Sequence, residues 1–212
     1  MLLVSSPPPL SVPDVVSTSS AYASSGVITM PTPSGVQAGD VLVMFIGQRG
    51  SQNAFTPPSG WTKVTQTTFG ASSMHLLYKV AGASEPATFT VNPDSGGAHL
   101  GVVAAVRRAS QSASINNQSS GVDINSNSAF TTTPVAVNVN NAVVLHMGWL
   151  HSAADIAWSS VTEIEQVVYP SSSVLSVAKQ LETTARTVPG TSATTTASAG
   201  KGWMSAAIAP LA

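Results

Sequence analysis

The sequence predicts an all-β protein, a two-sheet antiparallel β-sandwich of jelly-roll-like form with about ten strands. Short runs rich in valine, threonine and isoleucine recur about every ten to fifteen residues, and glycine, proline and serine separate them. No amphipathic helical stretch stands between these runs, so parallel β-α-β units are not expected. Strands joined by short turns are typical of a sandwich or a barrel.

The first half of the chain is expected to contribute six strands. Gly60 follows two prolines and a serine, a composition that favours a tight turn into the next strand. Trp61 opens that strand and is expected to cover one end of the core, with an outward-facing binding role as the alternative. The almost wholly apolar run at 99–106 is typical of a strand buried on both faces. The six strands are expected at 26–30, 40–47, 61–69, 73–80, 87–91 and 99–106.

The second half is expected to contribute the remaining strands. Residues 178–186 have a helix-like composition, but the alternation in the preceding segment "SVLSV" favours a strand. The glycine-rich segments 95–99 and 200–203 do not stand at strand-to-helix junctions, so we interpret them as tight turns and not as phosphate-binding loops. The strands are expected at 129–139, 142–150, 160–169, 173–182, 191–198 and 202–211.

The composition indicates a protein that associates with others. The 212 residues suit one sandwich domain at 15–212 after an N-terminal segment at 1–14. Charged residues make up 8% of the chain, against about 25% in an average soluble protein. A surface that is polar through hydroxyl and amide groups has little charge repulsion to keep copies apart. We therefore expect a homo-oligomer, with a trimer favoured.

Charge and cysteine content exclude several classes of function. Lysine and arginine total eight and the formal net charge is −1, so no basic face for nucleic acid is expected. The chain has no cysteine, which excludes disulfides and thiolate catalysis. The start of the sequence lacks a basic region, so a signal peptide is not expected. No apolar run approaches the length of a membrane-spanning helix.

Residues 1–14 are expected to form an extended arm, because "SSPPPLSVP" favours polyproline geometry. The apolar side chains of this arm are too few to form a core, and proline lowers the entropic cost of docking the arm on a partner. We expect the arm to bind a neighbouring subunit or a capsid, and a disordered terminus is the alternative. The expected contact residues are Leu2, Leu3, Val4, Leu10 and Val12.

No histidine or acidic cluster in the sequence predicts a metal site or cofactor site. His146 and His151 are five residues apart, which places them on opposite faces of a strand, and His75 and His99 are likewise interpreted as structural. The segment "DINSNS" at 123–128 resembles the start of a calcium loop but lacks its glycine and its distant glutamate. We interpret it as a turn.

The sequence does not predict an enzyme. It contains no G-x-S-x-G nucleophile motif, and Glu163 and Glu165 are expected to share one strand face as solvated residues. Trp149 and Trp203 lie in apolar strands and are expected to be buried. Trp158 follows a loop and is the aromatic expected to be most exposed, as an interface anchor or a sugar-stacking platform.

Four segments together resemble a β-sandwich module of virion structural proteins of tailed bacteriophages. They are "GVQAGDVLVMFIG" (35–47), "TPPSGWTKV" (56–64), "HLLYKVAGASEPATFTV" (75–91) and "GWMSAAIAPL" (202–211). The resemblance implies a non-enzymatic virion protein, assembled in the host cytoplasm. We expect a capsid decoration (cement) protein whose partner is the major capsid protein. The alternative is a tail-tip or receptor-binding module that recognises host glycans.

Overall fold

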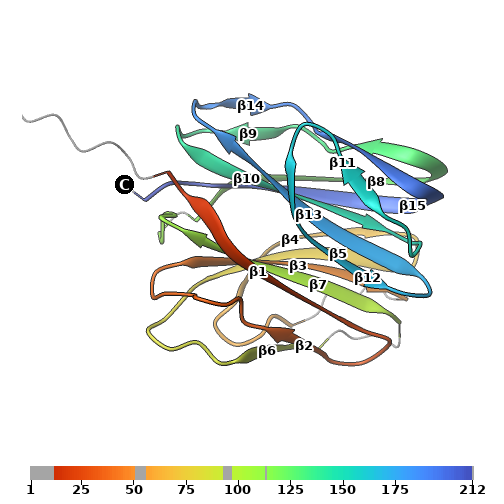
Figure 1. Ribbon diagram of the computed structural model, residues 1–212, viewed down its shortest axis with the longest axis horizontal. Coiled ribbons are helices and arrows are strands. Elements are labelled where there is room, and N and C mark those ends of the chain that lie inside the picture. Colours follow the sequence, from red (N-terminus) through yellow and green to blue (C-terminus); the bar gives the residue numbers. More distant parts are fainter. Residues whose placement is uncertain (1–11, 51–55, 93–96, 113, 212) are drawn as a thin grey trace, which may run out of the picture.

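The computed structural model describes residues 12–50, 56–92, 97–112 and 114–211, and these contain strands and turns but no helix. The predicted all-β, two-sheet antiparallel sandwich is confirmed (Figure 1). Fifteen strands are present in the described residues, more than the expected number of about ten and more than the twelve segments named from the sequence. No helix in this part of the chain is long and apolar enough to cross a membrane. The expected contact residues Leu2, Leu3, Val4 and Leu10 lie outside the described residues.

The first sheet, sheet 1, comes from the first half of the chain and has the strand order β1-β7-β3-β5-β4. A short two-stranded ribbon, β2-β6, covers its outer face and forms the lowest layer in Figure 1. The elements are β1 (Asp14–Ala23), β2 (Ile28–Pro31), β3 (Val41–Arg49), β4 (Thr62–Phe69), β5 (Ser72–Val80), β6 (Thr88–Val91) and β7 (His99–Arg107).

The second sheet, sheet 2, comes from the second half and has the order β8-β15-β10-β13-β12, with β11 beside the first part of β15. The ribbon β9-β14 covers its outer face, at the top of Figure 1. The elements are β8 (Ile115–Thr131), β9 (Val135–Val137), β10 (Ala142–Leu150), β11 (Ile156–Trp158), β12 (Thr162–Tyr169), β13 (Ser173–Glu182), β14 (Arg186–Val188) and β15 (Ser192–Ile208).

The two halves are copies of one seven-strand unit. Replacing β1 to β7 by β8, β9, β10, β12, β13, β14 and β15 converts one strand order into the other, ribbon included. The registers of the paired strands agree as well. Val41 pairs with Val106 in sheet 1. The residues 102 positions later, Val143 and Ile208, pair with each other in sheet 2. Strand β11 is the one described strand that the first half does not match.

Even the irregularities of the unit are repeated. β4 has a bulge between Lys63 and Thr65, and β12 has one between Glu163 and Glu165. The turn before each of these strands has a residue with positive φ, Gly60 at 80° and Ser160 at 64°. Gly60 therefore supplies the turn that the sequence predicted, and the serine shows that the second copy kept the conformation without glycine.

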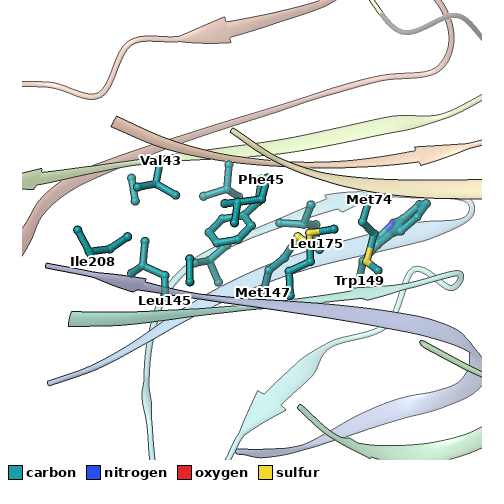
Figure 2. Packing of buried hydrophobic residues seen from close by; sticks show 14 of the residues in the cluster. Val43, Phe45, Met74, Leu145, Met147, Trp149, Leu175 and Ile208 are labelled. Carbon is teal, nitrogen blue, oxygen red and sulfur yellow. The ribbon is translucent and has the colours of Figure 1, made fainter. Parts of the chain in front are cut away.

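A single core joins the two sheets. The side chains that point inward from β3, β5 and β7 meet those from β10, β13 and β15, and Figure 2 shows Phe45, Leu145 and Trp149 in this layer. Trp149 fills the space above Gly47, its equivalent in sheet 1, where an added Cβ would lie 2.8 Å from the indole ring. The two copies thus fit together because one has tryptophan where the other has glycine.

Each sheet buries its outer face beneath its own ribbon. Leu42, Met44 and Ile46 of β3 pack against Met30 and Phe89 of the β2-β6 ribbon. This double burial explains why the central strands are apolar without alternation. Trp61 is 6% exposed and packs on Phe89 in this outer layer, with ring centroids 5.1 Å apart. Its predicted burial is confirmed, although it lies outside the core between the sheets.

Several strand predictions need correction. The segment 129–139 divides between the end of β8 and β9, and the two segments predicted at 191–198 and 202–211 form one strand, β15. Residues 200–203 are therefore part of a strand and not a tight turn. Strands β1 and β8 were missed because their serine-, threonine- and asparagine-rich sequences resemble loops. Asp14, which the sequence analysis assigned to the arm, begins β1.

Candidate functional site

A cleft lies at the end of the sandwich where β3 and β10 both finish. Its volume is about 660 Å³, and both sheets contribute to its walls. The lining residues include equivalent positions from the two copies: Ser24 and Ile124, Arg49 and His151, Phe69 and Tyr169, Ala98 and Gly200. Equivalent strands run in the same direction in the two sheets, because β3 and β10 both end at this cleft. The two copies are therefore related by a pseudo-two-fold axis that is parallel to the strands and passes through the cleft. We call it the dyad cleft.

The neighbouring edge strands of the two sheets are joined by polar contacts on both sides of the sandwich. β1 lies beside β12, and its equivalent β8 lies beside β4. Ser20 Oγ donates a hydrogen bond to Glu165 Oε1 at 3.0 Å on one side. On the other side Thr67 Oγ1 donates to Ser120 Oγ, the equivalent of Ser20, at 2.7 Å. Hydrogen bonds therefore join the two sheets along both pairs of neighbouring edge strands.

Arg49 provides the charge of the dyad cleft. It ends β3 in sheet 1, and its Nη1 donates a hydrogen bond to the carbonyl oxygen of Ser172 in the β12-β13 turn at 3.1 Å. The guanidinium group therefore bridges the two sheets across the cleft. It is the one charged side chain among the described residues that line the cleft.

His151, the equivalent of Arg49 in sheet 2, is a neutral group at neutral pH. Its backbone N–H donates to the carbonyl oxygen of Gly200 at 2.9 Å, and its ring stacks on Phe69 with centroids 4.6 Å apart. Burial, followed by the positive charge of Arg49, lowers the pKa of His151 to about 4. The buried Nε2 atom has no hydrogen-bond partner among the residues that the structure describes.

Aromatic rings form one side of the opening. Tyr169 ends β12 and is half-buried, and Tyr22 of β1 contacts its ring edge-on with centroids 5.5 Å apart. Tyr22 is 51% exposed. The dyad cleft thus combines one arginine, one neutral imidazole, serine hydroxyls and the half-buried ring of Tyr169.

The symmetry of the two copies is broken beside the cleft. Sheet 1 has buried polar side chains on its outer face, Gln48, Ser73, His75 and His99. Ser73 Oγ and His75 Nε2 are 2.9 Å apart. In sheet 2 the positions of Gln48 and Ser73 are taken by Leu150 and Val174, which belong to an apolar cluster with Phe130 and Ile156. Two of these four polar positions are thus apolar in the second copy, and the other two, those of His75 and His99, are taken by the buried polar residues Ser176 and Lys201.

Lys201, the equivalent of His99, holds the wall of the dyad cleft in place. It is 0% exposed, and its Nζ donates to the carbonyl oxygens of Asn125 at 3.2 Å, Asn127 at 3.0 Å and Ala199 at 3.1 Å. The carboxylate of Asp123 lies 3.6 Å away. Segment 123–127 therefore surrounds an ammonium group instead of a calcium ion. It belongs to β8, so its interpretation as a turn was wrong.

Three of the four histidines that were interpreted as structural are buried. His75 and His99 are 0% exposed and His146 is 1% exposed. His146 contacts Ser205 Oγ through Nδ1 at 2.9 Å and Gln180 Oε1 through Nε2 at 3.2 Å. The described residues contain no group of three or more histidine or acidic side chains that could hold a metal ion.

The bulge in β12 overturns the prediction for its two glutamates. Glu163 accepts a hydrogen bond from Ser176 on the outer face of sheet 2 at 3.0 Å, whereas Glu165 accepts one from Thr18 of β1 at 2.7 Å. The extra residue turns the two carboxylates to different sides. They do not share a face, and they do not form a pair across a cleft.

The tryptophans are more deeply placed than a binding platform requires. Trp149 is 0% exposed, as expected. Trp158, expected to be the most exposed aromatic, and Trp203, expected to be buried, are both half-buried, and each ring contacts Phe130. The indole N–H of Trp158 donates to Ser176 Oγ at 2.7 Å. The sequence predictions did not include the dyad cleft. An internal repeat could have indicated the two copies that form it, because "SGWTKVTQ" at 59–66 and "SSVTEIEQ" at 159–166 are similar and lie 100 residues apart.

Replacing Lys201 with methionine is expected to destabilise the protein by about 3–5 kcal/mol, because the buried carbonyl oxygens and Asp123 lose their cation. Lys179 is the matched control. Its Nζ lies 2.6 Å from Asp14 Oδ1, but both side chains are partly exposed, so Lys179→Met should cost less than about 1 kcal/mol. Urea unfolding of both variants measures the difference, and equal losses would contradict the role given to Lys201.

Stability should fall as the pH falls from 7.5 to 5. Burial lowers the pKa of His75 to about 3 and that of His146 to about 4, against 6.5 in the unfolded chain. Between these values the unfolded state binds protons that the folded state does not, so each histidine lowers the free energy of unfolding by roughly 2 kcal/mol at pH 5. Urea unfolding across this range tests the effect. His146→Gln should make the decline shallower, and an unchanged decline would contradict the assignment.

Comparison with known proteins found no matching family model, no matching curated protein and no matching solved structure.

Proposed function

We propose that this chain is a non-enzymatic structural protein of a tailed-phage particle, located on the virion. It attaches to the outer shell as a capsid decoration protein, with the major capsid protein as its partner. The resemblance of segments 35–47, 56–64, 75–91 and 202–211 to phage virion modules supports this proposal, and so does the charge-poor, hydroxyl-rich composition.

The observation that carries the proposal is a groove with an apolar part at the root of the N-terminal segment. The groove has a volume of about 420 Å³. Its apolar part consists of Val12, Pro13, Val143 and Leu181, and its other lining residues are Asp14, Arg108, Thr162, Lys179 and Gln180. Val12 is 36% exposed and Leu181 is 50% exposed, whereas Pro13 is buried. The apolar surface begins where the predicted arm joins β1. A partner that binds the arm would cover this surface in the same contact.

The edge strands favour association with uncharged surfaces. β1 and β8 consist mostly of serine, threonine, asparagine and small residues, and they expose Val16, Tyr22, Val122 and Ile124. Such edges have few charged side chains to repel a neighbouring strand. We propose that they also support a homo-oligomer, with a trimer favoured.

The dyad cleft favours a second candidate function, a tail-tip or receptor-binding module that recognises host glycans. A volume of about 660 Å³ falls in the usual range for small-ligand sites. Tyrosine rings with serine hydroxyls and an arginine can bind both the apolar faces and the hydroxyl groups of a sugar. This candidate places binding at the end of the sandwich, and not at Trp158.

Deletion of residues 2–11 is expected to leave the melting temperature nearly unchanged and to weaken retention of the protein on its particles. β1 begins at Asp14, so the sandwich keeps all its described strands. Co-sedimentation with purified virions of the phage that encodes the chain measures retention, and electron microscopy of labelled particles shows the location. A variant with residues 2–11 in scrambled order is the control for length. Equal retention of all three proteins would contradict a docking role for the arm.

A further inference from the structure

We propose that the groove at the root of the N-terminal segment binds the arm of a second copy of this chain. The apolar side chains of that arm that enter the groove are Leu2, Leu3 and Val4. This inference rests on the proposed homo-oligomer and names the contact that holds its copies together. The groove is the one of about 420 Å³ described above, and we call it the arm groove.

The arm groove is an uncovered end of the core between the two sheets. Leu175 and Val177 of β13 belong to this core. By strand alternation Lys179 and Leu181 lie on the same inward face of β13. Leu181 is the last inward position of the strand and is 50% exposed. Val143, a core residue that pairs with Leu181, also lines the groove. The apolar layer of the sandwich therefore continues to the surface at this end.

The equivalent positions of the first copy are better covered. The position of Leu181 is taken there by Val80, which is half-buried. The position of Lys179 is taken by Tyr78, which packs against the core. Lys179 instead forms an ion pair with Asp14. A large side chain thus helps to close one end of the core, whereas the other end is left for a cover from outside.

The arm has the chemistry to provide that cover. Residues 1–11 lie outside the described residues, and their sequence has apolar side chains, three consecutive prolines and no charged side chain. A polyproline backbone makes no internal hydrogen bonds, and its prolines have carbonyl oxygens but no N–H groups. Arg108 and Thr162 are exposed at the rim of the groove and carry N–H and O–H donors. An apolar segment whose prolines can only accept hydrogen bonds suits such a groove.

The length of the arm favours the groove of a second copy over the groove where the arm begins. Val12 lines the groove of its own chain. The prolines at 7–9 are expected to keep the arm extended, with an advance of about 3.1 Å per residue. Leu3, nine residues before Val12, then lies about 28 Å from it. If each copy passes its arm to a neighbour, every groove is filled in a closed ring, the favoured trimer included.

Disulfide cross-linking tests the contact directly, because the chain contains no cysteine of its own. Full-length Leu3→Cys and a longer, tagged Leu181→Cys are mixed under reducing conditions and then oxidised. We expect a disulfide-linked pair with one chain of each kind on a non-reducing gel. Val27→Cys is the matched control for Leu181→Cys. Val27 is 47% exposed and lies outside the arm groove, so its mixture with Leu3→Cys should give little mixed product.

Light scattering of the full chain over a range of concentrations measures how strongly the copies associate. Leu181→Ser should raise the dissociation constant of the oligomer at least about ten-fold, because the arm loses an apolar contact. Replacing Leu2, Leu3 and Val4 together with serine should have at least the same effect. Val27→Ser, a substitution at a similarly exposed position, should leave the dissociation constant unchanged.

The outcomes separate this inference from the oligomer on which it rests. An oligomer that forms no mixed disulfide and is unaffected by Leu181→Ser would overturn the arm contact and leave the homo-oligomer standing. A chain carrying both Leu3→Cys and Leu181→Cys that forms only an internal disulfide would show that the arm fills its own groove, and would overturn the exchange. A full chain that stays monomeric would overturn the homo-oligomer and this inference together, while the proposed capsid attachment would be unaffected.

Discussion

Burial of two sheet faces against each other is the interaction on which the rest of the structure depends. Each seven-strand unit can cover the outer face of its sheet with its own ribbon, but its inner face has no cover within the unit. The second copy supplies that cover. Three or more strands with one apolar face need such a partner for stability. At the axis the Trp149 ring of one copy occupies the space beside Gly47 of the other, where a Cβ would not fit.

The symmetry also explains where the candidate site lies. A pseudo-two-fold axis between two sheets brings equivalent strand ends together, so equivalent residues of the two copies line the same cleft. The cleft has varied chemical groups because the residues at equivalent positions differ. Arg49 faces His151, and Phe69 faces Tyr169. The buried Lys201 fixes the β8 segment whose Ile124 lines the same cleft. Structure and site therefore depend on the same duplication.

The sequence predicted the apolar strands well and the polar ones poorly. β10 and β13 have the predicted ends, because runs such as "AVVLHMGWL" are distinctive. β1 and β8 were missed, since their side chains pack little and their strand conformation comes from pairing with β7 and β15. Bulges are likewise invisible in a simple alternation, so Glu163 and Glu165 were placed on one face. The partner of segment 123–127, Lys201, lies more than 70 residues away, and no local pattern indicates it.

The shared core should make the two copies one cooperative folding unit. Native-state hydrogen exchange at increasing denaturant concentration measures it most directly, because it reports the free energy of opening for each strand. We expect the central amides of β3 and β7 and those of β10 and β15 to exchange only by global unfolding, with the same free energy and the same dependence on denaturant. Exchange of one sheet at a clearly lower free energy, while the other stays protected, would show instead that the two copies unfold independently.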